Sequence, residues 1–271
     1  MHGSNMPAAL AKVVPEHPDL ATLCLFVGHP RSGHTLVGAL LDAHPDVVLA
    51  QKLDVLRLAT GPGSARALVG AILTSSSQAA RSGRSASGYD YEVPGQWQGR
   101  HRTLRVVGDK SAGHTTARLA GQGPTLAALR QRLPLSQVLV HVVRDPLDNV
   151  STLVRRGSFA SVERAIAFYD ELCGAVAVVE AAAGPAMHRL HLEDLIARPH
   201  ERLRSLATTL GVDAPPDWLE ACAARLWPKA ARTRELVEWT PAQRDAIAAI
   251  AERHAGWFRR GEAHPEARAC G

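Results

Sequence analysis

Short apolar runs, each closed by a glycine or a polar cluster, recur along the chain. Residues 22–27 are almost wholly apolar and end at Gly28 and Pro30, which predicts a parallel strand buried on both faces. Residues 104–107 and 138–143 repeat this pattern, and a polar cluster and a helix-like stretch follow each of them. The alternation of strand and helix predicts an α/β fold, with a central parallel sheet inside three α/β/α layers.

Helical spacing fills most of the chain between and after these runs. Apolar residues recur three and four positions apart from Leu36 to Leu41, until His44 and Pro45 close the segment. Beyond about residue 160 the pattern is mainly helical, so we expect a helical C-terminal part. Further expected elements are strands at 47–50 and 188–192 and helices at 53–60 and 64–80.

The segment after residue 80 interrupts the helical pattern. Residues 81–88 contain only Ser, Gly, Arg and Ala, which predicts a loop, and Tyr89, Tyr91 and Val93 then alternate as in a strand. We expect a lid or a hairpin here. Together with Trp97, these aromatic side chains would either wall an acceptor pocket or pack on the body of the protein.

Composition indicates a globular protein. The 271 residues are 46% hydrophobic and 21% charged, and we expect an N-terminal extension over 1–20 and a single domain over 21–271. No apolar run approaches the ~18 residues of a membrane span, and the first residues do not have the pattern of a secretory signal. The four cysteines are widely spaced, which predicts neither a disulfide framework nor a metal site. We therefore expect a cytoplasmic protein without a metal.

The net charge of +5 fits either a polyanionic partner or a solvated basic surface. Nucleic acid is a poor candidate, because there is no run of five or six basic residues and aromatic residues are only 4%. A compact site for a small anionic ligand fits the charge better. The sequence does not give the oligomeric state.

The segment Gly28-His-Pro-Arg-Ser-Gly-His-Thr35 has the glycine spacing of a phosphate-binding P-loop, with His34 where that motif requires lysine. A strand-to-helix loop of this kind directs backbone N–H groups and a helix N-terminus at an anion. Arg31 lies inside the loop, where it would reach the oxygen between a phosphate and a transferred group. Ser32 and Thr35 add hydroxyl donors.

This loop resembles the 5′-phosphosulfate loop of sulfotransferases that use 3′-phosphoadenosine 5′-phosphosulfate (PAPS). The following stretch, Leu40 to Asp46, resembles its counterpart in tyrosylprotein sulfotransferases and in many bacterial sulfotransferases. A second segment, Arg144-Asp-Pro-Leu-Asp-Asn-Val-Ser-Thr152, resembles the family's 3′-phosphate segment, an arginine with a hydroxyl residue eight positions later. The resemblance covers roughly residues 22 to 212. It implies a donor site formed by Pro30, Arg31, Ser32, Gly33, His34, Thr35, Arg144, Ser151 and Thr152.

The resemblance also implies the catalytic groups. Arg31 and Lys110, the latter in a segment that resembles the family's Asp-Lys element, would stabilise charge on the departing phosphate oxygen, without a metal. The general base is open, because Lys52 occupies the position where tyrosylprotein sulfotransferases have a glutamate. The candidates are Asp54, His34 and His114, whose alternative roles are a helix cap, a phosphate ligand and a helix-start residue.

Two further family features are missing. The C-terminal glycine-lysine motif of cytosolic sulfotransferases is absent, and Leu36 replaces the aromatic residue that follows their loop, so the group that stacks on adenine is unassigned. Arg232 and Arg234 would supply the missing cations, or they would form a solvated basic face.

We therefore expect transfer of a sulfonate from PAPS, which leaves 3′-phosphoadenosine 5′-phosphate (PAP), to a hydroxyl or amine of a small molecule or natural product. One alternative is a P-loop kinase, which would need a lysine at His34, Mg²⁺ and a carboxylate such as Asp145. The other is an inactive homologue that only binds PAP, suggested by Lys52 in place of the expected base.

Overall fold

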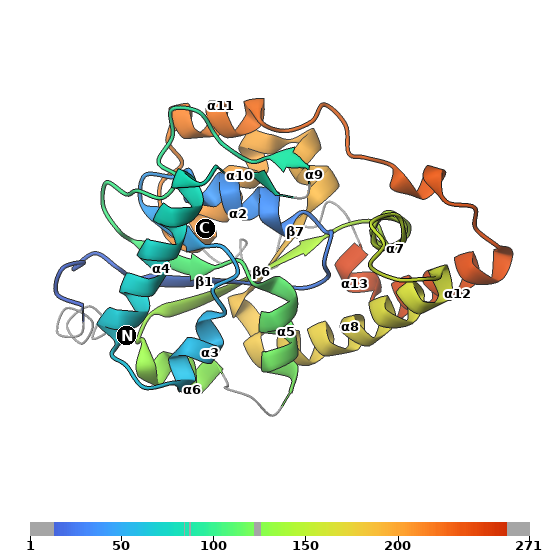
Figure 1. The fold of residues 1–271 in the computed structure, drawn as a ribbon, viewed down its shortest axis with the longest axis horizontal. Coiled ribbons are helices and arrows are strands. Elements are labelled where there is room, and N and C mark those ends of the chain that lie inside the picture. Colours follow the sequence, from blue (N-terminus) through green and yellow to red (C-terminus); the bar gives the residue numbers. More distant parts are fainter. Residues whose placement is uncertain (1–13, 84, 87, 122–125, 259–271) are drawn as a thin grey trace, which may run out of the picture.

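Five parallel strands form one central sheet in the computed structural model, which describes residues 14–83, 85–86, 88–121 and 126–258 (Figure 1). All four strand pairs in it are parallel, and β1 lies in the centre. The order across the sheet is β2 (Val47–Ala50), β5 (Val106–Asp109), β1 (Thr22–Val27), β6 (Ser136–Val143) and β7 (Met187–His191).

Both faces of the sheet are covered. Along β1, Cys24 and Phe26 contribute to one hydrophobic cluster, while Leu23 and Leu25 contribute to another, as the two-residue period of a strand requires. A strand buried on both faces reads as a continuous apolar run, which is the pattern of residues 22–27. The predicted three-layer α/β/α fold is confirmed.

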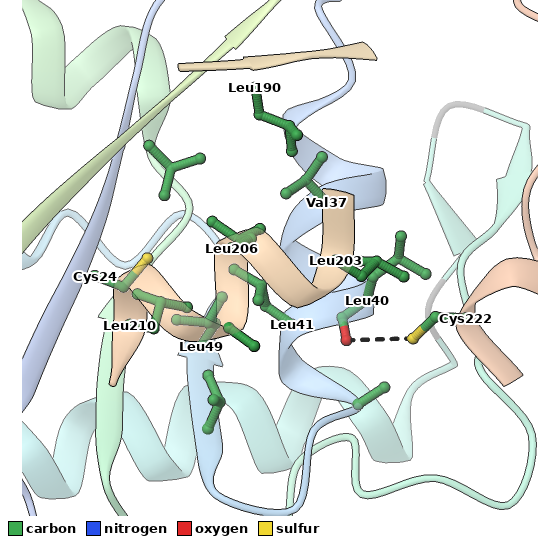
Figure 2. Packing of buried hydrophobic residues seen from close by; sticks show 14 of the residues in the cluster. Cys24, Val37, Leu40, Leu41, Leu49, Leu190, Leu203, Leu206, Leu210 and Cys222 are labelled. Carbon is green, nitrogen blue, oxygen red and sulfur yellow. Dashed lines mark hydrogen bonds between the residues drawn. The ribbon is translucent and has the colours of Figure 1, made fainter. Parts of the chain in front are cut away.

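Helices α2 (His34–Asp42), α10 (Pro199–Leu210) and α11 (Pro216–Ala224) cover one face. Figure 2 shows leucines of α2 and α10 packed over Cys24 and Leu49 of the sheet. Trp218 of α11 donates its indole N–H to the Leu40 carbonyl at 2.9 Å, and the Cys222 thiol lies 3.7 Å from the same oxygen. Helix α2 is therefore held between the sheet and the outer helices.

The opposite face carries α3 (Val55–Thr60), α4 (Ala65–Arg81), α5 (Ala112–Ala120) and α6 (Leu126–Arg132). Beyond β6 the chain is mostly helical, as predicted. Helices α7 and α8 pack with α12 and α13 around Tyr169 and Trp257. These and the remaining elements are α7 (Pro146–Arg155), α8 (Val162–Ala183), η1 (Gly184–Ala186), α9 (Leu192–Ala197), η2 (Thr233–Leu236), α12 (Pro241–Arg253) and α13 (Ala255–Phe258).

Most expected elements are found within one or two residues of their predicted bounds, and two segments differ in kind or extent. The strand expected at 104–107 is β5 at 106–109, because Gly108 continues the strand where a polar cluster was expected. A side chain there would meet the Cys24 carbonyl oxygen at 2.0 Å, so only glycine allows β1 and β5 to pair at this point. The loop expected over 81–88 is wrong in part, since β3 (Ser85–Ala86) pairs with β4 (Tyr89–Asp90) as a short hairpin.

The segment before β1 is packed on the body over its described part. Val14 and Leu20 are buried in the same cluster as Leu135, although they belong to the expected extension over 1–20. Residues 1–13 of that extension lie outside the described part of the chain. Within the described ranges, none of the helices has the length and apolar character needed to cross a membrane.

Candidate functional site

The candidate residues gather where the parallel strands end. The loop of residues 28–33, which we call the donor loop after its predicted role, follows β1. Lys110 follows β5 and Arg144 follows β6, so all three lie at the carboxyl edge of neighbouring strands. Ligands in open α/β sheets bind at this edge. The strand order therefore brings Lys110 to Thr35, 75 residues away in sequence, and Arg144 to Arg31, 113 residues away.

The donor loop, residues 28–33, has a backbone that requires its glycines. Gly28 and Gly33 have φ of 115° and 102°, and a side chain at either position would clash, with His141 at 2.6 Å or with Leu192 at 2.8 Å. Arg31 also has a positive φ, 68°, which is costly for a residue with a side chain and is common at ligand sites. No side chain caps the N-terminus of α2, which follows the loop.

The side chain of Asn149 in α7 holds the donor loop in place. Its buried side-chain amide donates to the Ser32 hydroxyl at 2.8 Å and to the Pro30 carbonyl at 3.1 Å. The Gly28 N–H donates to the Thr116 hydroxyl of α5 at 2.9 Å. Side chains from two helices thus set the shape of the loop. The Ser32 hydroxyl accepts a hydrogen bond from Asn149 within the protein.

Arg144 connects the donor loop with a second polar cluster. One guanidinium nitrogen donates to the Arg31 carbonyl and to the Thr152 hydroxyl, both at 3.0 Å. The other donates to the Ala231 carbonyl at 3.0 Å and to the Thr233 hydroxyl at 3.2 Å. Burial lowers the pKa of Arg144, partly opposed by nearby carboxylates.

Three hydroxyls cluster at this arginine, and two of them, those of Thr152 and Thr233, accept hydrogen bonds from it. Ser151 and Thr152 each lie 2.9 Å from the Thr233 hydroxyl, and all three are close to the Asp148 carbonyl. The sequence analysis named Ser151 and Thr152 but missed Thr233, which follows the predicted Arg232 directly. Arg232 itself is exposed and pairs with Glu235 at 3.0 Å, so the structure does not bring its side chain into this cluster.

Arg234, the other basic residue considered, has a structural role. Its guanidinium pairs with Asp148 at 2.7 Å and with Asp145 at 2.9 Å, which holds η2 against α7. Burial acts to lower the pKa of Arg234, but the hydrogen bonds and charges of the two aspartates outweigh it and raise the pKa. The two ion pairs of Arg234 thereby place Thr233 beside Arg144.

Lys110 and Thr35 form the other side of the site. The Lys110 ammonium, which is 5% exposed, donates to the Thr35 hydroxyl at 3.2 Å. Burial lowers the pKa of Lys110 to about 8, the charge of Lys52 contributes to the decrease, and Asp109 opposes it. A buried cation without a full counter-charge favours an incoming anion.

The three candidate bases differ in their surroundings. Asp54 caps α3 and accepts three hydrogen bonds from Arg118, at 2.8, 3.1 and 2.6 Å. Burial would raise the pKa of Asp54, but the bonds from Arg118 and the Arg57 N–H lower it overall. His34 is buried, its Nε2 lies 2.9 Å from the Val27 carbonyl, and burial lowers its pKa to about 4. His114 is exposed on α5.

One family model, described as the sulfotransferase family, matches residues 25–216. The chain belongs to the sulfotransferase family. The match contains the donor loop, Lys110 and the Arg144 segment, whereas Thr233 lies beyond it. The comparison with curated proteins found no match.

Solved sulfotransferase structures share the fold at low sequence identity. The sulfotransferase domain of an olefin synthase from Synechococcus PCC 7002 is 14% identical, with a TM-score of 0.53 and coverage of 89% of this chain and 97% of that one. The domain from the curacin biosynthetic pathway is 15% identical, with a TM-score of 0.53 and coverage of 87% and 98%. A Mycobacterium avium sulfotransferase is 12% identical, with a TM-score of 0.51 and coverage of 95% and 82%.

At its donor loop the sulfotransferase has a buried histidine cluster, of which the sequence analysis named only His34. We define it as His29, His34 and His141, which are 3%, 6% and 1% exposed. The His29 ring stacks on Tyr169 with centroids 4.2 Å apart, and its Nε2 lies 3.2 Å from the Cys173 sulfur. The cluster has no sequence signal, because its members come from the loop, α2 and β6.

Two neighbouring groups of polar side chains, each with a cation, meet at the donor loop, and we refer to them as subsites. Arg144 and its three hydroxyls form the first, and the donor loop with Arg31, Thr35 and Lys110 forms the second. Such a pair suits an anion with two charged groups. Among the described residues, no group of three or more histidine, cysteine, aspartate or glutamate side chains is placed to bind a metal.

Proposed function

We propose that this sulfotransferase takes its sulfonate from PAPS and transfers it to a hydroxyl, or an amine, of a small-molecule acceptor. The observation that carries the proposal is the position of Arg144, which contacts both the Arg31 carbonyl and the Thr152 hydroxyl at 3.0 Å. One guanidinium thus lies between the donor loop and the hydroxyl cluster. A nucleotide with a 5′-phosphosulfate and a 3′-phosphate has charged groups for both subsites.

The donor loop supplies the electrostatics of the transfer. As the bond between sulfur and the bridging oxygen breaks, negative charge develops on the phosphate that leaves. Backbone N–H groups at the start of α2, together with Arg31 and Lys110, stabilise that charge. Lys110 is held by Thr35 from one side, which fixes its ammonium next to the loop.

The position of His34 disfavours the kinase alternative. A P-loop kinase uses a lysine at this position as a permanent cation on the phosphates. Here the imidazole is buried, its Nε2 lies 2.9 Å from the Val27 carbonyl, and its pKa is lowered to about 4 by burial. The side chain is therefore neutral near pH 7 and supports the loop from inside, which leaves Arg31 and Lys110 as the cations.

Isothermal titration with PAP, AMP and ATP plus Mg²⁺ at low salt tests the donor site without knowledge of the acceptor. We expect PAP to bind at least about tenfold more tightly than AMP, because only PAP fills the 3′ subsite, and Mg²⁺ to have no effect. Tighter binding of ATP with Mg²⁺ would instead favour the kinase.

Two variants sharpen this titration. Arg144→Gln should remove most of the preference for PAP over AMP, whereas Arg204→Gln on the exposed surface of α10 should leave it unchanged. Turnover of labelled PAPS then separates an active enzyme from an inactive PAP-binding homologue. Lys110→Met should abolish turnover while PAP still binds, and normal rates in that variant would exclude its assigned role.

A further inference from the structure

The turn that joins β2 to α3 has a strained backbone, and we call residues 51–54 the strained turn. Lys52 and Asp54 have φ of 59° and 61°, in the left-handed region that favours glycine. Residues with a side chain keep this conformation only where surrounding contacts hold them, and they are common at functional sites. The strained turn therefore needs support from another segment.

This support comes from the carboxylate of Asp109, the last residue of β5, which is 1% exposed. Its two oxygens accept the Leu53 N–H and the Val55 N–H, each at 3.1 Å. The Ser111 hydroxyl accepts the Asp54 N–H at 3.3 Å and also forms a hydrogen bond with the Asp109 carboxylate. Three consecutive backbone N–H groups are thus held by side chains at the end of β5.

The strained turn lies beside Lys110. The Lys110 N–H donates to the carbonyl of Ala50, the residue before the turn, at 3.0 Å. A Cβ added at Gly38 of α2 would lie 3.0 Å from the Lys110 side chain and 3.9 Å from the Gln51 amide nitrogen. The turn and Lys110 therefore meet at one place on α2, the helix that follows the donor loop.

Two lysines flank the contact between Asp109 and the strained turn. Lys52 directly precedes Leu53, whose N–H donates to the carboxylate, and Lys110 directly follows Asp109. Burial lowers the pKa of Lys110, the charge of Lys52 adds to this decrease, and the charge of Asp109 opposes it. The nearby His34 is neutral at the pH where Lys110 titrates, because burial lowers the pKa of His34 to about 4. The position of the turn therefore sets how strongly the two ammonium groups repel.

We propose that Asp109 is a positioning residue of the donor site, which holds the strained turn so that the ammonium of Lys52 stays close to that of Lys110. It acts through the N–H groups of Leu53 and Val55 and does not need to touch the substrate. If Asp109 only stabilised the start of α3, its loss would destabilise the fold without moving Lys52. This inference rests on the proposed function for the role of Lys110, but its test needs no donor.

A double-mutant cycle on the pKa of Lys110 tests this role. The chain has four lysines, Lys12, Lys52, Lys110 and Lys229, so an NMR titration of the full chain labelled in its lysine side chains gives few resonances. The Lys110→Met variant assigns the resonance of Lys110. We expect a pKa of about 8 for Lys110 in the unchanged protein, and Lys52→Asn should raise it because a neighbouring positive charge is removed.

The effect of Lys52→Asn is then measured again in the Asp109→Asn background. Asparagine keeps the size of the side chain but offers only one accepting oxygen, and its NH2 group faces the second backbone donor. Without the carboxylate, the strained turn relaxes and Lys52 is no longer fixed near Lys110. The shift caused by Lys52→Asn should therefore fall to less than about half of its value in the unchanged background.

Asp42→Asn is the matched control for the loss of a buried carboxylate. The Asp42 side chain of α2 accepts the Leu49 N–H at 2.7 Å and the Gly99 N–H at 3.0 Å, and both donors lie outside the strained turn. This variant should lower the stability in denaturant unfolding but leave the shift caused by Lys52→Asn complete.

Ser111→Ala gives a milder perturbation of the strained turn, and it decides the question if Asp109→Asn does not fold. It removes the hydroxyl that supports the Asp54 N–H and the Asp109 carboxylate. The shift caused by Lys52→Asn should become smaller in this background, though less so than with Asp109→Asn.

Three results would overturn the positioning role. The first is a Lys110 pKa that Lys52→Asn does not move in the otherwise unchanged protein. The second is a complete shift in the Asp109→Asn and Ser111→Ala backgrounds, because the charges then act independently. The third is an equal loss of the shift with Asp42→Asn, because general destabilisation would then be the cause. If the cycle shows the coupling but PAP does not bind, the proposed function is wrong while the role of Asp109 in placing Lys52 stands.

Discussion

At the scale of single residues, the site depends on the buried cation of Lys110. Lys110 is 5% exposed, and its ammonium donates to a neutral hydroxyl, that of Thr35. Lys52 occupies the position at which the resemblance to tyrosylprotein sulfotransferases implies a glutamate. Its positive charge lowers the pKa of Lys110 further and does not neutralise the ammonium. The presence of Lys52 in place of a glutamate therefore affects the pKa of Lys110 as well as the identity of the general base.

This arrangement predicts a pH dependence of donor binding. Lys110 has a pKa of about 8 in the donor-free protein, so it loses its proton, and its attraction for the donor, as the pH rises through that value. PAP affinity, measured by titration between pH 6.5 and 9.5, should fall on the alkaline side. Lys110→Met should bind PAP more weakly and lack that fall.

Lys52→Asn separates this mechanism from a general effect of alkali. Removing the Lys52 charge raises the pKa of Lys110, so the alkaline fall should move to higher pH even if overall affinity decreases. Asparagine tolerates the positive φ of 59° at this position. An unchanged midpoint in this variant would show that Lys110 is not the titrating group.

At the scale of elements, α7 contributes neighbouring side chains to both the hydroxyl cluster and the donor loop. Thr152 accepts a hydrogen bond from Arg144, Ser151 contacts Thr233 beside it, and Asn149 supports the donor loop. Periodicity predicts that such a helix follows β6, and the motif from Arg144 to Thr152 identifies the two hydroxyls. It does not identify Asn149, whose partners Pro30 and Ser32 lie more than 115 residues away and become visible only when the strand order is known.

The role of Asn149 is testable by two substitutions of different chemistry. Asn149→Ala removes the donor for the Pro30 carbonyl and the Ser32 hydroxyl, and we expect a loss of about 1–3 kcal/mol in unfolding free energy and weaker PAP binding. Asn149→Asp keeps the size but places a carboxylate against a carbonyl in a buried site, so it should be more damaging than alanine.

Denaturant unfolding and PAP titration of both variants measure these effects. The matched control is Gln243→Ala, since this amide caps α12 at the surface, away from the donor loop. Equal stability of the Asn149→Ala variant and the unchanged protein would show that the loop keeps its shape without this support.

At the scale of the whole molecule, the sequence predicted what local patterns encode and missed what the sheet assembles. The five strands, the helical layers and the two motif-bearing loops follow from apolar runs and glycine spacing. The position of Thr233 beside Arg144, the pairing of Arg234 with Asp148, and the ring contact between Tyr89 and Trp227 join segments more than 80 residues apart. No local pattern records such contacts, and Arg232 was named in place of its neighbour for this reason.

The histidine cluster at the donor loop also forms only when the chain folds, because its members lie far apart in sequence. It makes the stability of the fold sensitive to acid. Burial lowers the pKa of His29 to about 3 and that of His34 to about 4, and burial also lowers the pKa of His141 well below its usual value. The unfolded chain has histidine pKa values near 6.5, so below that pH it binds more protons than the folded state. Stability is therefore complete above about pH 6.5 and is lost as the pH falls toward 4.

Denaturant unfolding at several pH values between 7.5 and 4.5 measures this slope as protons bound on unfolding. His29→Phe keeps a ring to stack on Tyr169 but cannot titrate, so the slope should decrease by about one proton. Val178→Ala changes an exposed apolar residue of α8 that does not titrate, and it should leave the slope unchanged. If both variants keep the full slope, the acid sensitivity comes from carboxylates and not from the cluster. A decrease confined to His29→Phe would show that the buried imidazole of His29 contributes to the acid sensitivity.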